Sequence, residues 1–317
     1  MFKRSLVLLA IILGVLITAC TPKATAAPPI TIRFAMLPII DALPMYVAEG
    51  EGLFEKHNII LEFIPVGSAA ERDQIMAAGQ ADSMINDTVS TLFYNKDQTQ
   101  IQNVRFARTA TETTPQYHIL ASSQSGITTA EGLKGVEIGI SQGTVIEYVT
   151  DRLLQAEGFQ PGEIKTVAVP NIAERMTLLG SGELGAATLP DPFPALAMQS
   201  GAVDVLNDSK HPEYGYSVIS FRKPFIDQNP EAVRGFLAAI EEAVELINAD
   251  PAKYQDMLVE QKLVPAPVAG SYSIPPYPKA DVPSQSQWQD VLDWAKEKGL
   301  LDKDVSYESS VTDEYLP

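Results

Sequence analysis

An internal repeat constrains the fold of this chain more than any other feature of its sequence. In each copy, the residues predict a helix, a turn, a strand, a second helix and a second strand. The tripeptide Ala-Glu-Arg opens the second helix of both copies, at 70–72 and 173–175, and its alanine stands nine positions before a glycine. A chance match is the alternative, which the shared order of elements disfavours. Because alternating strands and helices favour parallel sheets covered by helices, the repeat predicts an α/β fold with two similar lobes and a cleft.

The cleft determines where a ligand site is expected. In open α/β sheets, ligands bind beyond the carboxyl ends of the strands, so the loops that follow the strands of both lobes are the candidate site. Their polar and aromatic residues are the predicted ligand contacts: Asp41, Asn86, Asp87, Thr88, Tyr117, Gln142, Thr144, Glu147, Tyr148, Asn171, Asp191 and Phe193. The alternative is that the polar residues only cap helices, which is common for Asp, Asn and Thr, and that Tyr148 packs in the core.

The N-terminus predicts export. Lys3 and Arg4 precede an apolar stretch at 6–17 that ends in small residues, which is the order of a signal peptide. The stretch is shorter than the ~20 residues of a spanning helix, although an uncleaved membrane anchor is the alternative. Both interpretations hold the protein at a membrane, facing outward.

The only cysteine follows this stretch. Residues 16–20, Leu-Ile-Thr-Ala-Cys, resemble a bacterial lipobox. This resemblance implies removal of residues 1–19, lipidation of Cys20, and a lipid-anchored protein at the extracytoplasmic face of the cell membrane. Residues 20–29 are small and proline-rich, so we expect a flexible tether before ordered structure begins near Ile30.

The composition excludes several classes of protein. The net charge of −17 disfavours nucleic acid as a partner, because that affinity depends on Lys and Arg neutralising phosphates. A single cysteine builds neither a disulfide framework nor a structural zinc site. The three histidines, His57, His118 and His211, share no metal-ligand spacing. We therefore expect no metal, no cofactor and no enzymatic activity.

One motif resembles a dinucleotide fingerprint. Residues 180–185 satisfy G-x-G-x-x-G, but a helix is predicted before them and a strand after them. The fingerprint requires the reverse order, so that phosphates meet a helix N-terminus. We interpret these glycines as the end of a helix and a turn.

The C-terminal third is more helical. Asn229-Pro230 is typical of a helix start, and a second amphipathic helix carries Trp288 and Trp294 as core residues. Residues 264–283, rich in proline and tyrosine, are expected to cross the surface.

Several segments together resemble a known family. They are Leu43-Pro44-Met45-Tyr46-Val47-Ala48-Glu49-Gly50-Glu51-Gly52-Leu53-Phe54, Gly79-Gln80-Ala81-Asp82, Gln142-Gly143-Thr144 and Pro190-Asp191-Pro192-Phe193-Pro194-Ala195-Leu196. The chain resembles ABC-importer substrate-binding proteins of the nitrate/sulfonate/taurine and thiamine-pyrimidine-precursor type over roughly residues 30–260. The resemblance implies a type II periplasmic-binding fold. It also implies a monomer with a small-molecule ligand in the interlobe cleft and permease subunits as partners.

The same resemblance implies the lobe boundaries. Residues 30–115 with 217–317 would form one lobe and 116–216 the other, with two crossovers as a hinge that closes over the ligand. An enzyme on this fold, such as a pyrimidine-forming synthase, is one alternative. An outward-facing sensor or adhesion module is another.

The loops favour a weakly charged ligand. They are acidic, amide-bearing and aromatic, and Arg108 is the only base near them, with Glu112 as a surface partner. A sulfonate or nitrate site needs basic groups or free helix N-termini, for which Thr88 and Thr144 are candidates. Carboxylates and amides suit ring N–H and hydroxyl donors, so we favour riboflavin. Thiamine-pyrimidine precursors and sulfonate, nitrate or taurine are the alternatives.

Overall fold

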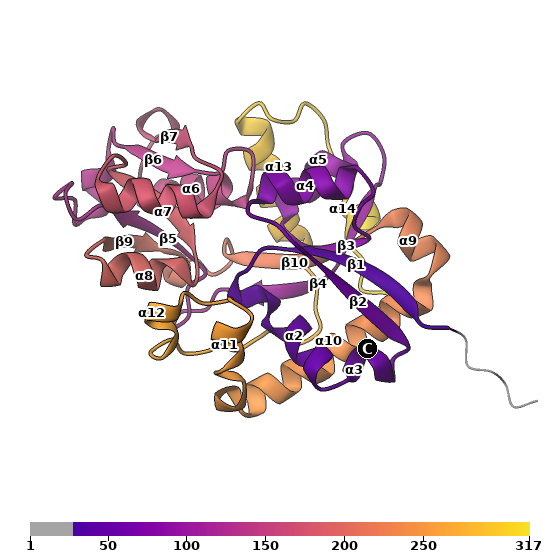
Figure 1. Ribbon diagram of the computed structural model, residues 1–317. Helices are drawn as coiled ribbons and strands as arrows, with labels where there is room; N and C mark the ends of the chain where they lie inside the picture. The colour runs from indigo at the N-terminus through magenta and orange to yellow at the C-terminus, as the bar shows by residue number, and fades with distance from the viewer. Residues whose placement is uncertain (1–27) are drawn as a thin grey trace, which may run out of the picture.

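The computed structural model describes residues 28–317, so the predicted signal peptide and Cys20 lie outside the described residues. Two five-stranded sheets, each flanked by helices, confirm the predicted α/β class (Figure 1). Their strand orders are β2-β1-β3-β10-β4 and β7-β6-β8-β5-β9. The strands are β1 Ile30–Met36, β2 Ile59–Pro65, β3 Ser83–Asn86, β4 Ile101–Thr109, β5 Tyr117–Ala121, β6 Glu137–Ile140, β7 Lys165–Ala168, β8 Ala186–Pro190, β9 Val203–Asn207 and β10 Tyr216–Arg222.

Four of the five strands in each sheet run in the same direction, so both sheets are mostly parallel, as predicted. The reversed strand is β10 in the first sheet and β5 in the second. The chain passes between the sheets at 110–116 and 208–215, and each passage leads into the reversed strand. The carboxyl ends of the forward strands in the two sheets therefore face each other. We call each sheet with its helices the first and the second lobe.

Helices cover the faces of both sheets (Figure 1). The α-helices are α2 Leu43–Gly50, α3 Leu53–Lys56, α4 Ala69–Ala77, α5 Thr88–Asn95, α6 Val145–Ala156, α7 Ile172–Ser181, α8 Phe193–Gln199, α9 Lys223–Gln228, α10 Pro230–Ala249, α11 Met257–Glu260, α12 Ala266–Ala269, α13 Gln285–Glu297 and α14 Tyr307–Ser310. Short 3-10 turns are η1 Ile40–Ala42, η2 Ala130–Leu133, η3 Pro161–Glu163, η4 Asp208–Lys210 and η5 Pro251–Tyr254. Among these described helices, none is both long and apolar enough to cross a bilayer.

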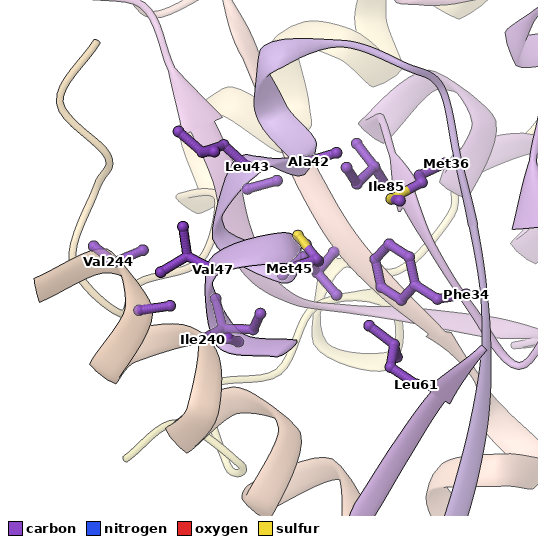
Figure 2. Packing of buried hydrophobic residues seen from close by; sticks show 14 of the residues in the cluster. Phe34, Met36, Ala42, Leu43, Met45, Val47, Leu61, Ile85, Ile240 and Val244 are labelled. Atoms are coloured by element: carbon purple, nitrogen blue, oxygen red, sulfur yellow. The ribbon is translucent and has the colours of Figure 1, made fainter. Parts of the chain in front are cut away.

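The core of the first lobe lies between its sheet and helices α2 and α10. Figure 2 shows Met45 and Val47 of α2 near Ile240 and Val244 of α10, with Phe34 of β1 beside them. The predicted helix start at Asn229-Pro230 is confirmed, although the Asn229 side chain donates to the Phe225 carbonyl instead of capping α10. Burial of this apolar stripe, at about 25 cal/mol per Å², provides the main stabilisation of the lobe.

Helix α13 contacts both lobes. It packs against α5 of the first lobe and α6 of the second, and Trp288 and Trp294 are buried there, as predicted. Trp294 donates from Nε1 to the Asp151 carboxylate of α6 at 2.8 Å. Lys298, just after α13, contacts Asp151 and Glu147 at 3.0 Å each. Helix α13 and Lys298 thus form a third link between the lobes, in addition to the passages at 110–116 and 208–215.

The segment at 264–283 does not lie on the surface throughout, so that prediction is wrong. Tyr277 is buried, and its hydroxyl donates to the Ile40 carbonyl at 2.5 Å.

The glycine motif at 180–185 ends α7, with Gly182 in the left-handed conformation at φ 79°. This confirms a helix end and a turn.

The two passages between the lobes are tied to each other. Ala110 donates its backbone N–H to the Gly215 carbonyl at 2.6 Å. The buried Asp208 carboxylate accepts the backbone N–H groups of Gln116 and Tyr117 at 2.8 and 3.2 Å. Because backbone groups of one passage bond to the other, the two behave as one connection.

This close packing predicts the effect of a methyl group at Gly215. A Cβ there would lie 1.8 Å from Asp208 Oδ2 and 2.8 Å from Ala110 Cβ. We expect Gly215→Ala to lower the free energy of unfolding by about 2 kcal/mol or more, measured by urea denaturation. Gly162→Ala is the control, because no atom lies within 4 Å of its Cβ. Equal stability of the two variants would contradict the packing described here.

Candidate ligand-binding site

A cavity lies between the lobes, at the carboxyl ends of their strands. It is partly open to solvent, and its cavity volume is about 60 Å³. Both lobes contribute apolar side chains to it, among them Ile39, Ile85 and Ile172. Four of the predicted contact residues also line it: Asp41, Asn86, Asp87 and Tyr117.

Arg72 lies on the first-lobe wall of this cavity and is fully paired. It projects from α4, contacts Asp73 at 2.9 Å and Asp87 at 3.0 Å, and donates to Ser90 at 2.7 Å. Burial lowers the pKa of Arg72, but the carboxylates of Asp73 and Asp87 outweigh burial and raise it. The Arg72 charge is therefore neutralised within its own lobe.

Arg175 lies on the second-lobe wall and has no acidic partner among residues 28–317. It is 1% exposed, donates from Nη1 to the Val169 carbonyl at 2.7 Å, and leaves Nε without a hydrogen bond. Burial lowers the pKa of Arg175 to about 10. The cavity therefore carries a buried cation whose charge no neighbouring carboxylate balances.

These arginines are the two Ala-Glu-Arg arginines of the sequence repeat. Each comes from inside a helix, α4 or α7, whereas the predicted contacts came mainly from the loops that follow strands. The expectation that Arg108 is the only base near the cleft is therefore wrong. The repeated tripeptide was the signal that could have identified Arg72 and Arg175.

Several buried polar atoms at the cavity lack hydrogen-bond partners within the described chain. They are Asp41 Oδ1, Asn86 Oδ1, Ser141 Oγ and Arg175 Nε. Buried polar groups are nearly always paired, with protein, water or ligand. Acceptors on the first lobe and a cationic donor on the second therefore indicate a site for a polar ligand.

Asp41 lies on η1, at the end of the cavity next to the passages. Its Oδ2 accepts from Ser217 at 2.5 Å and from Gln116 at 3.1 Å. Burial raises the pKa of Asp41, and Arg108, 3.8 Å away, opposes this shift.

Arg108 is buried and does not pair with Glu112, so that surface prediction is wrong. Its Nη1 lies 2.9 Å from Asp191 Oδ2, an ion contact without hydrogen-bond geometry. The Tyr272 hydroxyl also donates to Asp191. Asp191 is thus engaged by the first lobe and does not line the cavity.

The remaining predicted contacts lie around the cavity and do not line it. Thr144 and Asn171 cap α6 and α7, just as Asp87, which does line the cavity, caps α5. Thr88 and Phe193 are the first residues of α5 and α8, and Gln142 is exposed. Glu147 accepts the Gly143 backbone N–H at 2.8 Å, and the Tyr148 hydroxyl donates to the Asp290 carboxylate at 2.6 Å. The helix N-termini at α5 and α6, considered for an anion, are thus occupied by Asp87 and Glu147.

No group of three or more His, Cys, Asp or Glu in residues 28–317 is arranged to hold a metal ion. His118, in β5, contacts Asp204 at 2.9 Å and is not among the cavity-lining residues.

The fold and the cleft define a two-lobed α/β protein of the periplasmic-binding type. The profile of the NMT1/THI5-like family matches residues 40–254, and the chain belongs to that family. A protein of Escherichia coli (strain K12) assigned to aliphatic sulfonate binding is 27% identical over 155 residues. The match covers 49% of this chain and 48% of that protein, so it spans about half of the relative's length.

Solved structures share the whole fold. The alkanesulfonate-binding protein SsuA from Xanthomonas axonopodis pv. citri, bound to MOPS, matches with a TM-score of 0.76 and 19% identity, over 90% of this chain and 99% of that one. The desulfurization enzyme DSZB matches with a TM-score of 0.69 and 13% identity, over 90% and 97%. At these identities the likeness concerns the fold alone, which hosts both binding proteins and an enzyme.

The raised pKa of the Asp208 carboxyl group leads us to expect that the stability of the folded protein depends on pH. Burial raises its pKa from 3.8 to about 6, so between these values the folded state holds a proton that the unfolded state releases. Its stabilising contribution is complete below pH 3.8 and is lost as the pH rises through 6. At roughly 1.4 kcal/mol per pKa unit, the loss is at most about 3 kcal/mol.

The Asp208→Asn variant isolates this effect, because it cannot titrate. We expect the unfolding free energy of wild type to fall relative to Asp208→Asn between pH 4 and 7. Urea denaturation of both proteins at each pH measures the difference. Parallel pH profiles would show that Asp208 has an ordinary pKa.

Proposed function

We propose that this chain is the extracytoplasmic solute-binding protein of an ABC importer, which delivers a small organic ligand to permease subunits as a monomer. Membership of the NMT1/THI5-like family and the similarity to a protein assigned to aliphatic sulfonate binding support this function. The predicted signal peptide and the lipobox at Cys20 support lipid anchoring at the outer face of the cell membrane.

The observation that carries the ligand class is the unpaired cation of Arg175. A buried charge is costly unless it is paired, and the carboxylates near Arg72 and Arg108 are already bound to those arginines. An anionic group at Arg175 would supply the missing partner. The many apolar residues of the cavity suit an aliphatic or ring portion. We infer that the ligand is an amphiphilic organic anion of the alkanesulfonate type.

Closure of the two lobes over a ligand follows from the presence of candidate ligand contacts in both lobes. A ligand that touches Arg175 in the second lobe and Asn86 in the first holds the two lobes together. The tied passages at 110–116 and 208–215 would act as the hinge. We keep 30–115 with 217–317 and 116–216 as the proposed lobes, supported by the composition of the two sheets.

A second candidate is a flat heteroaromatic ligand, riboflavin or a thiamine-pyrimidine precursor. The unpaired acceptors Asp41 Oδ1 and Asn86 Oδ1 favour it, because they suit ring N–H or hydroxyl donors, and Tyr117 offers an aromatic surface. A binding role instead of catalysis is supported by the cavity lining, which in the described chain includes no histidine, cysteine or lysine.

Substitution of Arg175 separates the candidates. We expect Arg175→Gln to weaken binding of an alkanesulfonate by about tenfold or more, because hydrogen bonds to charged groups contribute about 1.5–3 kcal/mol. The melting temperature without ligand should stay equal or rise, since a buried unpaired charge is removed. Isothermal titration calorimetry with alkanesulfonates, riboflavin and a pyrimidine precursor shows which ligand the wild type binds and how much affinity Arg175→Gln loses.

Arg222→Gln is the matched control, because Arg222 lies outside the cavity and makes no ion pair within residues 28–317. It should bind as wild type does. Riboflavin binding that Arg175→Gln leaves unchanged would favour the heteroaromatic candidate. If none of the three ligand classes binds, the proposed ligands are wrong.

A further inference from the structure

Asp191 connects the two lobes at a point outside the ligand cavity. It directly follows β8 of the second lobe, and its backbone N–H donates at 2.8 Å to the carbonyl of Gln116, the residue before β5 of that lobe. The side-chain partners of Asp191 are Arg108 and Tyr272, which both belong to the first lobe. We call the side chains of Arg108, Asp191 and Tyr272 the clasp. No member of the clasp lines the ligand cavity, so the contact needs no ligand.

Tyr272 is held in place by the first lobe. Its side chain packs against the first-lobe core, and its backbone carbonyl accepts from Gln255 Nε2 at 2.9 Å. The same Gln255 amide donates to the Ala269 carbonyl at 2.8 Å, which fixes the loop between α12 and Tyr272. Burial and the Asp191 charge raise the pKa of Tyr272, so its hydroxyl keeps its proton and donates. Tyr272 therefore presents a fixed donor to the second lobe.

Arg108 makes separation of the clasp costly. It is 1% exposed, and its Nη1 lies 2.9 Å from Asp191 Oδ2 but 3.8 Å from Asp41 Oδ1. If the lobes moved apart, Asp191 would withdraw and leave the guanidinium with the more distant carboxylate alone. Breaking a buried ion pair is strongly unfavourable, because a charge remains without adequate compensation.

Apolar side chains surround the clasp on the same side of the molecule. Helix α8, which begins two residues after Asp191, contacts α12 of the first lobe (Figure 1). Ala195 and Leu196 of α8 pack against the first-lobe core. The polar and apolar contacts are made by the same two segments, 191–196 and 266–272, so they form and break together.

We propose that the clasp holds the lobes together independently of the ligand, and thereby sets the affinity for every ligand by one common factor. This inference rests on the proposed function in one respect, because it takes the cavity between the lobes as the ligand site. When only the closed arrangement binds, the apparent dissociation constant is the intrinsic one divided by the closed fraction. A contact that raises the closed fraction therefore strengthens binding without touching the ligand.

The first test needs no ligand. Small-angle neutron scattering of the full-length protein, in detergent whose scattering is matched to that of the solvent, measures the radius of gyration of the protein alone. Tyr272→Phe removes one hydrogen bond to a charged group, which should lower the ratio of closed to open molecules by about tenfold or more. We expect a larger radius of gyration for Tyr272→Phe and for Asp191→Asn, and the largest for the double variant.

The second test is calorimetric titration of the same proteins with ethanesulfonate, octanesulfonate and riboflavin. Each clasp variant should bind every ligand of the wild type more weakly, by up to about tenfold for Tyr272→Phe. The factor should be the same for each ligand, because the clasp acts on the lobes. A residue that contacts the ligand would instead change the order of preference.

Tyr254→Phe is the matched control. The Tyr254 hydroxyl donates to the Glu51 carboxylate at 3.2 Å, and both residues belong to the first lobe. The variant loses the same kind of hydrogen bond as Tyr272→Phe, but not one between the lobes. Its radius of gyration and its dissociation constants should equal those of wild type. Melting curves identify any variant that does not fold, and Tyr272→Phe tests the clasp independently of Asp191→Asn.

Two results would overturn the inference. One is an equal radius of gyration for wild type, Tyr272→Phe, Asp191→Asn and the double variant. The other is a loss of affinity in Asp191→Asn that differs between ligands at an unchanged radius, which would place Asp191 in contact with the ligand. A wild type that binds none of the three probes would contradict the ligands of the proposed function, whereas the scattering comparison would still decide whether the clasp exists.

Discussion

The architecture depends on how the charge of buried arginines is neutralised. Arg72 is paired within the first lobe, and Arg108 joins that lobe to Asp191 of the second. Each pair removes a charge that would be costly in the interior. Arg175, the repeat counterpart of Arg72, has no such partner within residues 28–317. The difference between equivalent arginines makes the cleft asymmetric, since one wall is balanced and the other has an excess positive charge.

Most of the fold was predictable from sequence because it follows from local patterns. Alternating strands and helices, the helix start at Pro230 and the buried tryptophans all depend on residues close in sequence. The segment at 264–283 was not predictable, because Tyr277 is fixed by the Ile40 carbonyl, more than two hundred positions away. Proline content indicates irregular backbone but says nothing about burial.

The position of the candidate cavity was more predictable than its charge. The rule that ligands bind at strand ends pointed to the edge of the sheets where Asp41, Asn86 and Tyr117 line the cavity, and their contact with a ligand stays a prediction. The same rule did not identify Arg72 and Arg175. The long side chain of an arginine one turn inside a helix reaches as far as a residue in the preceding loop. Which acid neutralises which base also depends on the packing of distant segments, as the pairing of Arg108 with Asp191 instead of Glu112 illustrates.

The position of α13 has a consequence for how the chain acquires its structure. Asp151 and Tyr148 of α6 are covered by Trp294 and Asp290, which belong to the last tenth of the sequence. The second lobe therefore completes its packing only after nearly the whole polypeptide has been made. Contacts between such distant segments slow folding. A nascent chain that stays incompletely folded until its end emerges is well suited to passage through a membrane in an extended form.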